Sequence, residues 1–109
     1  MNMYTSGEYL ARNPTWHEED SSWKASQIVS LLHANRVTPG SVCEIGCGAG
    51  EIIRCMASNL PDSRFVGYDI SPQAISRAQH KTRANLSYIE GDAFASDTHY
   101  DLAMAIERV

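Results

Sequence analysis

The stretch Glu44-Ile45-Gly46-Cys47-Gly48-Ala49-Gly50 decides the fold of this chain. It begins in a short strand predicted over residues 41–45. It leads into an amphipathic helix, which the i, i+3, i+4, i+7 spacing of apolar residues over 53–60 predicts. Glycines at such a junction let the main chain approach a ligand without obstruction by Cβ atoms. The helix that follows aims its N-terminal amides at a negative group on the ligand. The stretch therefore predicts a strand, a ligand-binding glycine turn and a helix.

The same alternation of strands and helices continues toward the C-terminus. Residues 64–69 predict a second strand, after which Ser71 is the expected N-cap and Pro72 the first position of a helix. Residues 86–90 predict a third strand, and residues 100–106 predict a fourth, whose apolar run indicates burial on both faces. This alternation is typical of parallel βαβ units with right-handed crossovers.

The segment before the glycine stretch predicts one regular helix. Apolar residues at helical spacing indicate an amphipathic helix from about Ser22 to a point before Pro39. Residues 1–20 follow neither regular period and contain Pro14, which we interpret as a break. They therefore predict an irregular or short helical lead-in.

We expect an α/β fold, a parallel sheet with helices on both faces. Residues 1–40 are expected to form the lead-in and capping helix, and residues 41–109 the ligand-binding βαβ portion. At about 30 or more residues per βαβ unit, the second segment supplies only about two crossovers. The sheet is therefore expected to be incomplete and truncated at its C-terminal side.

The spacing of the glycines and nearby carboxylates distinguishes between nucleotide ligands. Asp69 ends the second predicted strand 19 residues after Gly50, where a carboxylate can accept both hydroxyl protons of a ribose. Dinucleotide-binding fingerprints read GxGxxG, whereas these glycines read GxGxG and Glu51 takes the place of the last small residue. Glu44 would repel a pyrophosphate but suits an ammonium or sulfonium group. A simple tight turn and an ordinary aspartate at the end of a strand remain the alternatives.

Four segments together resemble the class I, Rossmann-like S-adenosylmethionine-dependent methyltransferases. They are similar, in order, to that family's first four motifs: 42–50, Gly67-Tyr68-Asp69-Ile70, Gly91-Asp92-Ala93 and 100–109. The resemblance covers roughly two thirds of the chain. A less specific likeness, over residues 16–24, is to the lead-in of some bacterial small-molecule members.

The resemblance implies that nine residues bind S-adenosylmethionine. At the methionine moiety these are Gly46, Cys47, Gly48 and Gly50, together with Glu44, which helps to orient the amino group. At the nucleoside they are Asp69 on the ribose, Ile70 against the adenine, and Asp92 with the Ala93 amide at the adenine edge. For Asp92, a role confined to the turn remains the alternative.

The implied activity is transfer of a methyl group from the sulfonium to an oxygen, nitrogen or carbon atom of a small-molecule acceptor. The family's Rossmann-like sheet has seven strands and this chain supplies about four, so we expect the 109-residue chain to be the cofactor-binding portion and inactive alone. The alternative from another class is a non-catalytic S-adenosylmethionine or nucleoside-binding module or fragment. No catalytic base and no metal ligand set is assigned.

Four further residues, to which the resemblance assigns no role, have open roles. Trp16, His17 and Lys24 are either packing or surface groups or contacts for the cofactor or acceptor. Glu107 follows the fourth predicted strand, where it either faces the acceptor or begins a helix.

Composition and charge indicate which partners, cysteine chemistry and location to expect. The net charge is −4, so we expect no nucleic-acid partner. The one basic concentration is interpreted as the solvated end of a helix and consists of Arg77, His80, Lys81 and Arg83. The three cysteines, Cys43, Cys47 and Cys55, fit no disulfide or zinc pattern and are expected to be reduced and mostly buried. With no membrane or signal segment in the sequence, a cytoplasmic location is expected, and a homo-oligomer is left open.

Overall fold

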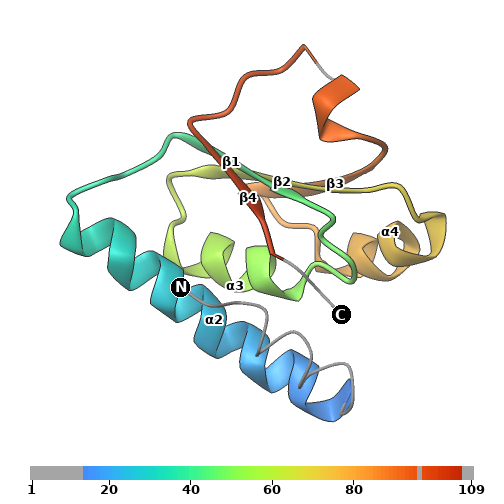
Figure 1. Ribbon diagram of the computed structural model, residues 1–109, viewed down its shortest axis with the longest axis horizontal. Helices are drawn as coiled ribbons and strands as arrows, with labels where there is room; N and C mark the ends of the chain where they lie inside the picture. Colours follow the sequence, from blue (N-terminus) through green and yellow to red (C-terminus); the bar gives the residue numbers. More distant parts are fainter. Residues whose placement is uncertain (1–13, 96, 107–109) are drawn as a thin grey trace.

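The computed structural model describes residues 14–95 and 97–106, which form a four-stranded parallel sheet (Figure 1). The strands are β1 (Ser41–Ile45), β2 (Arg64–Asp69), β3 (Leu86–Glu90) and β4 (Leu102–Ala105), in the order β3-β2-β1-β4. The first three have the predicted bounds. The parallel α/β class predicted from the sequence is confirmed, and β4 lies beside β1 at an edge.

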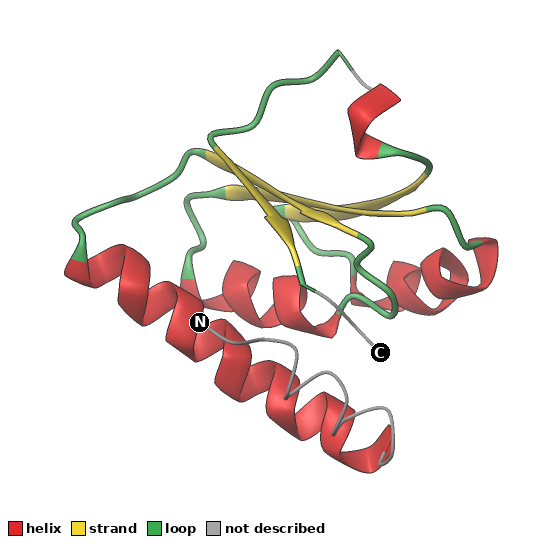
Figure 2. Ribbon diagram, in the orientation of Figure 1, coloured by secondary structure: helices red, strands yellow, loops and turns green. Residues whose placement is uncertain are grey.

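Three α-helices cover one face of this sheet (Figure 2). They are α2 (Pro14–Ala34), α3 (Glu51–Asn59) and α4 (Pro72–Ala78), and α4 continues into the 3-10 helix η1 (Gln79–Lys81). The steps from β1 to β2 and from β2 to β3 run in the same direction across the sheet, so right-handed crossovers place α3 and α4 on the same side. The connection from β3 to β4 reverses that direction. It passes on the other side with only the 3-10 helix η2 (Ala93–Ala95), so within the described residues the expected second layer of α-helices is absent. None of the described helices is long and apolar enough to cross a membrane.

The core lies between the sheet and the helix layer. One buried cluster joins α2, α3 and α4 to the strand residues that point toward them, among them Val42, Phe65 and Leu86, which are aligned across β1, β2 and β3. In β4, Leu102 and Met104 pack against this cluster, whereas Ala103 and Ala105 are exposed. The prediction that the fourth strand is buried on both faces is therefore wrong, because α-helices cover only one face of the described sheet.

Helix α2 begins earlier than predicted. It starts at Pro14, which we interpreted as a break. The first helical position tolerates proline, because the N–H that proline lacks has no partner there in any case and its fixed φ suits a helix. By contrast, α4 begins as predicted, with Ser71 as N-cap accepting a hydrogen bond from the amide of Ala74 at 3.2 Å.

Asp101 joins the start of β4 to the start of β1. Its Oδ2 accepts hydrogen bonds from the amides of Gly40 at 2.7 Å and Ser41 at 3.2 Å. Its own amide donates to Ser41 Oγ at 3.1 Å. These three bonds fix the N-terminal edge of the β1–β4 pair, and the candidate site lies at the opposite edge.

Candidate cofactor site

The glycine loop after β1 has a backbone that ordinary residues avoid. Gly46, Gly48 and Gly50 have φ values of 69°, 59° and 77°, in the left-handed region that L side chains rarely adopt. A Cβ atom added to Gly46 would meet nothing within 4 Å, so the space beside this residue is open. The loop therefore combines an unusual conformation with a main chain that a ligand can approach.

Gly50 is glycine for a second reason, the ring of Tyr88. A Cβ atom at Gly50 would lie 2.3 Å from Tyr88 Cε1, and one at Gly67 would lie 2.7 Å from Tyr88 Cδ1. The Tyr88 hydroxyl donates to the Gly50 carbonyl oxygen at 2.8 Å, and this bond is buried. Burial is the main cause that raises the pKa of the Tyr88 phenol, so the hydroxyl keeps the proton that it donates. The sequence analysis predicted none of these contacts for Tyr88.

Asp69 connects the first three of the four predicted motifs. Its Oδ2 accepts from the Gly48 amide at 2.9 Å, and its Oδ1 accepts from the Ser71 amide at 2.8 Å. Its backbone carbonyl accepts from the Gly91 amide at 2.9 Å. The ends of β1, β2 and β3 are therefore linked by hydrogen bonds at one edge of the sheet. Each carboxylate oxygen still has acceptor capacity for a further donor.

Two apolar side chains project from this edge. Ile70, directly after β2, is 78% exposed, and Phe94, in η2 after β3, is 82% exposed. Asp92 is exposed, and its Oδ1 accepts from the Phe94 amide at 2.9 Å, whereas Ala93 is partly buried. The sequence predicted roles for Ile70, Asp92 and Ala93 but not for Phe94. An apolar residue directly after the third motif was the available signal.

Glu44 and Cys47 lie beneath the loop. Both are 0% exposed. Glu44 lies on the face of β1 toward the helices, aligned with Gly67 and Met104. The amide of Cys47 donates to the Tyr68 carbonyl at 2.9 Å, so it stabilises the loop. The prediction of reduced, buried cysteines is confirmed for all three.

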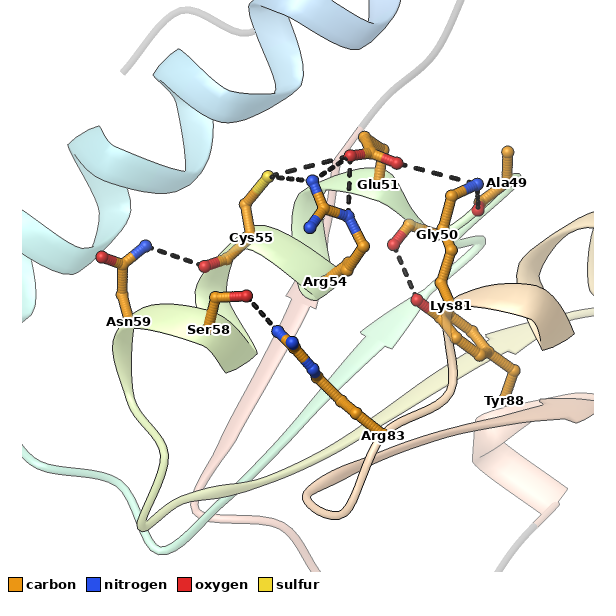
Figure 3. Close-up of polar contacts among 10 residues, drawn as sticks. All are labelled: Ala49, Gly50, Glu51, Arg54, Cys55, Ser58, Asn59, Lys81, Arg83 and Tyr88. Carbon is orange, nitrogen blue, oxygen red and sulfur yellow. Dashed lines mark hydrogen bonds and ion pairs between the residues drawn. The ribbon is translucent and has the colours of Figure 1, made fainter.

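A charged group borders the loop at the start of α3 (Figure 3). Glu51 forms an ion pair with Arg54, and the Lys81 ammonium lies 3.7 Å from Glu51 Oε2. Lys81 Nζ also donates to the Ala49 carbonyl at 2.8 Å. Arg83, two residues further on, donates to Ser58 Oγ. The interpretation of this basic segment as a solvated helix end is wrong for Lys81, which is partly buried and reaches back to the glycine loop. Arg83 is exposed, as that interpretation requires, although it also bonds to α3.

Lys24 has the packing role that was one of its two alternatives. It is 2% exposed and forms an ion pair with Asp20 one helical turn earlier, at 3.0 Å. The side chains of Trp16 and His17, and the whole of Glu107, lie outside what the structure describes.

A pocket of about 320 Å³ lies at the other edge of the sheet. Its lining includes Ser41, Arg64 and Leu86, which begin β1, β2 and β3. Ligands of open α/β sheets bind outside the carboxyl ends of the strands, where the strand order reverses. In this sheet the order reverses at β1, so the glycine loop and not this pocket is the candidate site.

The arrangement suits a cationic nucleoside better than a dinucleotide. A carboxylate, Glu51, stands at the first position of α3, where dinucleotide-binding folds place a pyrophosphate. Arg54 and Lys81 pair with Glu51 and offset its charge, whereas the Asp69 carboxylate stands beside the loop without an ion-pair partner among the described residues. Asp69 therefore favours hydroxyl donors or a positive group on the ligand over phosphates.

Comparison with known proteins agrees with this geometry. The family model described as "Methyltransferase domain" matches residues 42–108. The ribosomal RNA small subunit methyltransferase C of Citrobacter koseri is 35% identical over 78 residues, which make up 69% of this chain and 22% of that protein. The ribosomal protein L11 methyltransferase of a Janthinobacterium species is 38% identical over 71 residues, 60% of this chain and 23% of that protein. The chain thus spans about a fifth of the length of these relatives.

Solved structures show the same fold. The plantazolicin methyltransferase BpumL, in complex with S-adenosylhomocysteine, matches with a TM-score of 0.64 at 25% identity, over 92% of this chain and 39% of that one. The magnesium protoporphyrin IX methyltransferase of Synechocystis, also with bound S-adenosylhomocysteine, matches with a TM-score of 0.62 at 25% identity, over 77% of this chain and 41% of that one. With its parallel sheet, its glycine loop and a family match over more than half of its length, the chain belongs to the methyltransferase-domain family, in the Rossmann-like class that its motifs resemble.

Proposed function

We propose that this chain binds S-adenosylmethionine at the carboxyl edge of its sheet and is the cofactor-binding portion of a methyltransferase. The observation that carries the proposal is the Asp69 carboxylate, which connects the glycine loop to α4 and borders the open side of the loop. The solved neighbours with S-adenosylhomocysteine support it. The open space at Gly46 is where the main chain accepts a close ligand.

The proposed roles follow the edge from β1 to β3. The glycine loop, including Gly46, Gly48 and Gly50 with Cys47 beneath it, lines the methionine moiety, and the Glu44 charge below attracts its amino group. Asp69 accepts from the ribose hydroxyls. The exposed side chain of Ile70 packs on one side of the adenine. The exposed Asp92 carboxylate can accept from the adenine amino group, and the Ala93 amide can donate to a ring nitrogen.

The chemistry is a displacement at carbon. The bound cofactor would supply an activated methyl group: as an acceptor lone pair forms a bond to the methyl carbon, the S–CH₃ bond would break and leave its electron pair on a neutral thioether. For an acceptor O–H or N–H, the proton would pass to solvent, since no base is assigned in this chain. The residues of this chain act by binding and orienting the cofactor, which is the main source of rate in such a transfer.

We propose a small-molecule acceptor, and two features support it. The solved neighbours are a plantazolicin methyltransferase and a magnesium protoporphyrin IX methyltransferase. The chain also has a net charge of −4, which does not favour binding to a nucleic-acid backbone. The named relatives that act on ribosomal RNA and a ribosomal protein define the competing acceptor classes.

Calorimetric titration tests the cofactor. S-adenosylhomocysteine should bind with micromolar affinity and more tightly than NAD, because Glu51 occupies the first position of α3, where a pyrophosphate would bind. The matched control is Asp69→Asn, which keeps the shape of the side chain but removes its charge. Tighter binding of NAD, or equal binding of S-adenosylhomocysteine to Asp69→Asn and to the wild type, would overturn the assignment.

Methyl transfer needs a separate assay with the protein at its native length. Labelled S-adenosylmethionine is incubated with extracts divided into small molecules, RNA and protein. We expect label in the small-molecule fraction. Label only in RNA or protein contradicts the acceptor class. Binding without transfer to any fraction would favour the non-catalytic module instead.

A further inference from the structure

Two consecutive carbonyls of the glycine loop are held by side chains from elsewhere in the fold (Figure 3). Lys81 Nζ, from η1, donates to the Ala49 oxygen at 2.8 Å. The Tyr88 hydroxyl, from β3, donates to the Gly50 oxygen at 2.8 Å. Both donors come from the part of the chain that follows β2, more than 30 residues after the loop. The loop after β1 is therefore completed by the next βαβ unit.

Holding a carbonyl also fixes the amide behind it. Because a peptide unit is planar and trans, the C=O of one residue and the N–H of the next point in opposite directions. The carbonyl bound by Tyr88 belongs to the same peptide unit as the Glu51 amide, the first amide of α3. The same oxygen also accepts from the Arg54 amide within α3 at 3.2 Å, so the helix and Tyr88 together aim the Glu51 amide out of the N-terminus of α3.

The loop needs such restraints because its glycines offer little resistance of their own. Gly48 and Gly50 both have positive φ, and glycine adopts positive and negative φ about equally readily. One backbone bond already opposes rotation of each peptide unit: the Gly50 amide donates to the Cys47 carbonyl at 2.9 Å, and the Gly50 carbonyl accepts from the Arg54 amide at 3.2 Å. Lys81 and Tyr88 add a second bond to each unit, from donors that lie outside the loop and outside α3.

The two donors differ in burial, so their removal should affect ligand affinity and fold stability to different degrees. The Tyr88 hydroxyl is buried, so its loss affects the core as well as the loop. The Lys81 side chain is 23% exposed and is held over the loop by Glu51 at 3.7 Å. A lysine in that position contributes little to the core, so its removal tests the loop almost alone.

We propose that Lys81 and Tyr88 are positioning residues for the cofactor: each adds a side-chain bond to a loop carbonyl, at Ala49 and Gly50, so that the glycine loop keeps the shape that meets the ligand. This inference rests on the proposed function, since it names the residues that shape the same binding site. Neither residue is expected to touch the cofactor.

The test compares Lys81→Met and Tyr88→Phe, which remove each donor and keep most of the apolar bulk. Two matched controls remove similar bonds elsewhere. Arg83→Met deletes a cation of the same basic segment, one whose side chain donates to Ser58 Oγ on α3 and not to the glycine loop. Tyr68→Phe deletes a hydroxyl that pairs with Tyr100 at 2.5 Å, outside the loop. Each protein, at its native length, is titrated with S-adenosylhomocysteine at a temperature well below its melting temperature.

We expect each donor variant to raise the dissociation constant for S-adenosylhomocysteine by about three- to tenfold, the effect of one net hydrogen bond. Lys81→Met should leave the melting temperature nearly unchanged, whereas Tyr88→Phe should lower it. Lys81→Arg, which keeps a cationic donor, should restore affinity to within about twofold. Both controls should bind like the wild type.

Failure of this inference is distinguishable from failure of the cofactor assignment. If the wild type does not bind S-adenosylhomocysteine, the proposed function is wrong and the inference falls with it. If the wild type binds and Lys81→Met binds equally well, the positioning role is refuted alone. A lower melting temperature with unchanged affinity in Tyr88→Phe would likewise show a purely structural residue.

Discussion

The two glycines Gly46 and Gly50 have the same backbone conformation but different surroundings, and this predicts different responses to one added methyl group. Alanine at either position must adopt a φ near +70°, which costs about 1–2 kcal/mol for an L residue. At Gly46 the new Cβ enters open space. At Gly50 it lies 2.3 Å from a carbon of the Tyr88 ring.

The collision adds a second cost at Gly50. Inserting a methyl group into a packed region costs typically about 1–3 kcal/mol, because neighbouring atoms must shift. The Tyr88 ring cannot swing away freely, since its hydroxyl is bonded to the Gly50 carbonyl. Gly50→Ala should therefore destabilise the fold by about 2–5 kcal/mol, and Gly46→Ala by only about 1–2 kcal/mol.

Equilibrium urea unfolding, followed by far-ultraviolet circular dichroism, measures both changes. A double variant, Gly50→Ala with Tyr88→Leu, removes the ring and should recover part of the loss, with a coupling of about 1 kcal/mol or more. Among variants that remain folded, the loss of affinity for S-adenosylhomocysteine should be larger for Gly46→Ala than for Gly50→Ala. Gly46→Ala keeps the fold but places its Cβ in the space assigned to the cofactor, so its affinity for S-adenosylhomocysteine should fall. Equal destabilisation by the two alanines, or no recovery in the double variant, would refute the reasoning.

Three further outcomes are expected. Asp69→Ala should raise the dissociation constant for S-adenosylhomocysteine at least about tenfold. It should also lower the free energy of unfolding by about 1–2 kcal/mol, because the amides of Gly48 and Ser71 lose their acceptor. Unchanged affinity in a folded variant would show that Asp69 is not part of the site. Ile70→Ser should weaken the binding of S-adenosylhomocysteine by a few fold without changing the melting temperature, since the Ile70 side chain is 78% exposed. The control is Leu31→Ser on α2, where the side chain is 60% exposed, and it should change neither the affinity nor the melting temperature. The melting temperature should fall as the pH rises above about 9, because burial raises the pKa of Cys43, Cys55, Tyr88 and Tyr100 in the folded chain above their ordinary values of 9.0 and 10.0. The unfolded chain then releases protons that the folded chain keeps, so a melting temperature that is constant from pH 8 to 10.5 would contradict this.

Local patterns predicted the elements that local interactions determine. The bounds of β1, β2 and β3 follow from short apolar segments delimited by glycine, proline and aspartate. The start of α4 follows from Ser71 and Pro72, whose capping and fixed φ act within a few residues. The placement of Asp69 beside the glycine loop follows from parallel strands, whose carboxyl ends share one edge.

The features that sequence reasoning missed depend on distant neighbours. Alternation within β3 indicates that Tyr88 is buried, but its partner across the fold, Gly50, lies 38 residues earlier. From the sequence Lys81 is interpreted as a solvated cation. In the structure η1 continues from α4 and brings the Lys81 side chain back to the glycine loop, and no local pattern indicates this. The one-sided burial of β4 depends on which face of the sheet is covered, and an apolar run contains no information on that.

The anchor at Asp101 has a consequence for the order in which the chain folds. The two βαβ units from β1 to β3 close over stretches of about 20 residues each, and the glycine loop with its Asp69 and Tyr88 contacts belongs to them. Pairing β4 with β1 instead closes a loop of 60 residues, from Val42 to Leu102. On an otherwise unfolded chain such a closure costs roughly 3.6 kcal/mol of chain entropy on the (3/2)RT ln n scale. Once β1, β2 and β3 have paired, only residues 91–101 remain to be closed, at roughly 2.1 kcal/mol on the same scale. The three hydrogen bonds between Asp101 and residues 40 and 41 offset this cost at the point where the strands meet. During synthesis, the cofactor edge can therefore assemble from β1, β2 and β3 before β4 leaves the ribosome, and β4 then docks onto a strand that is already in place.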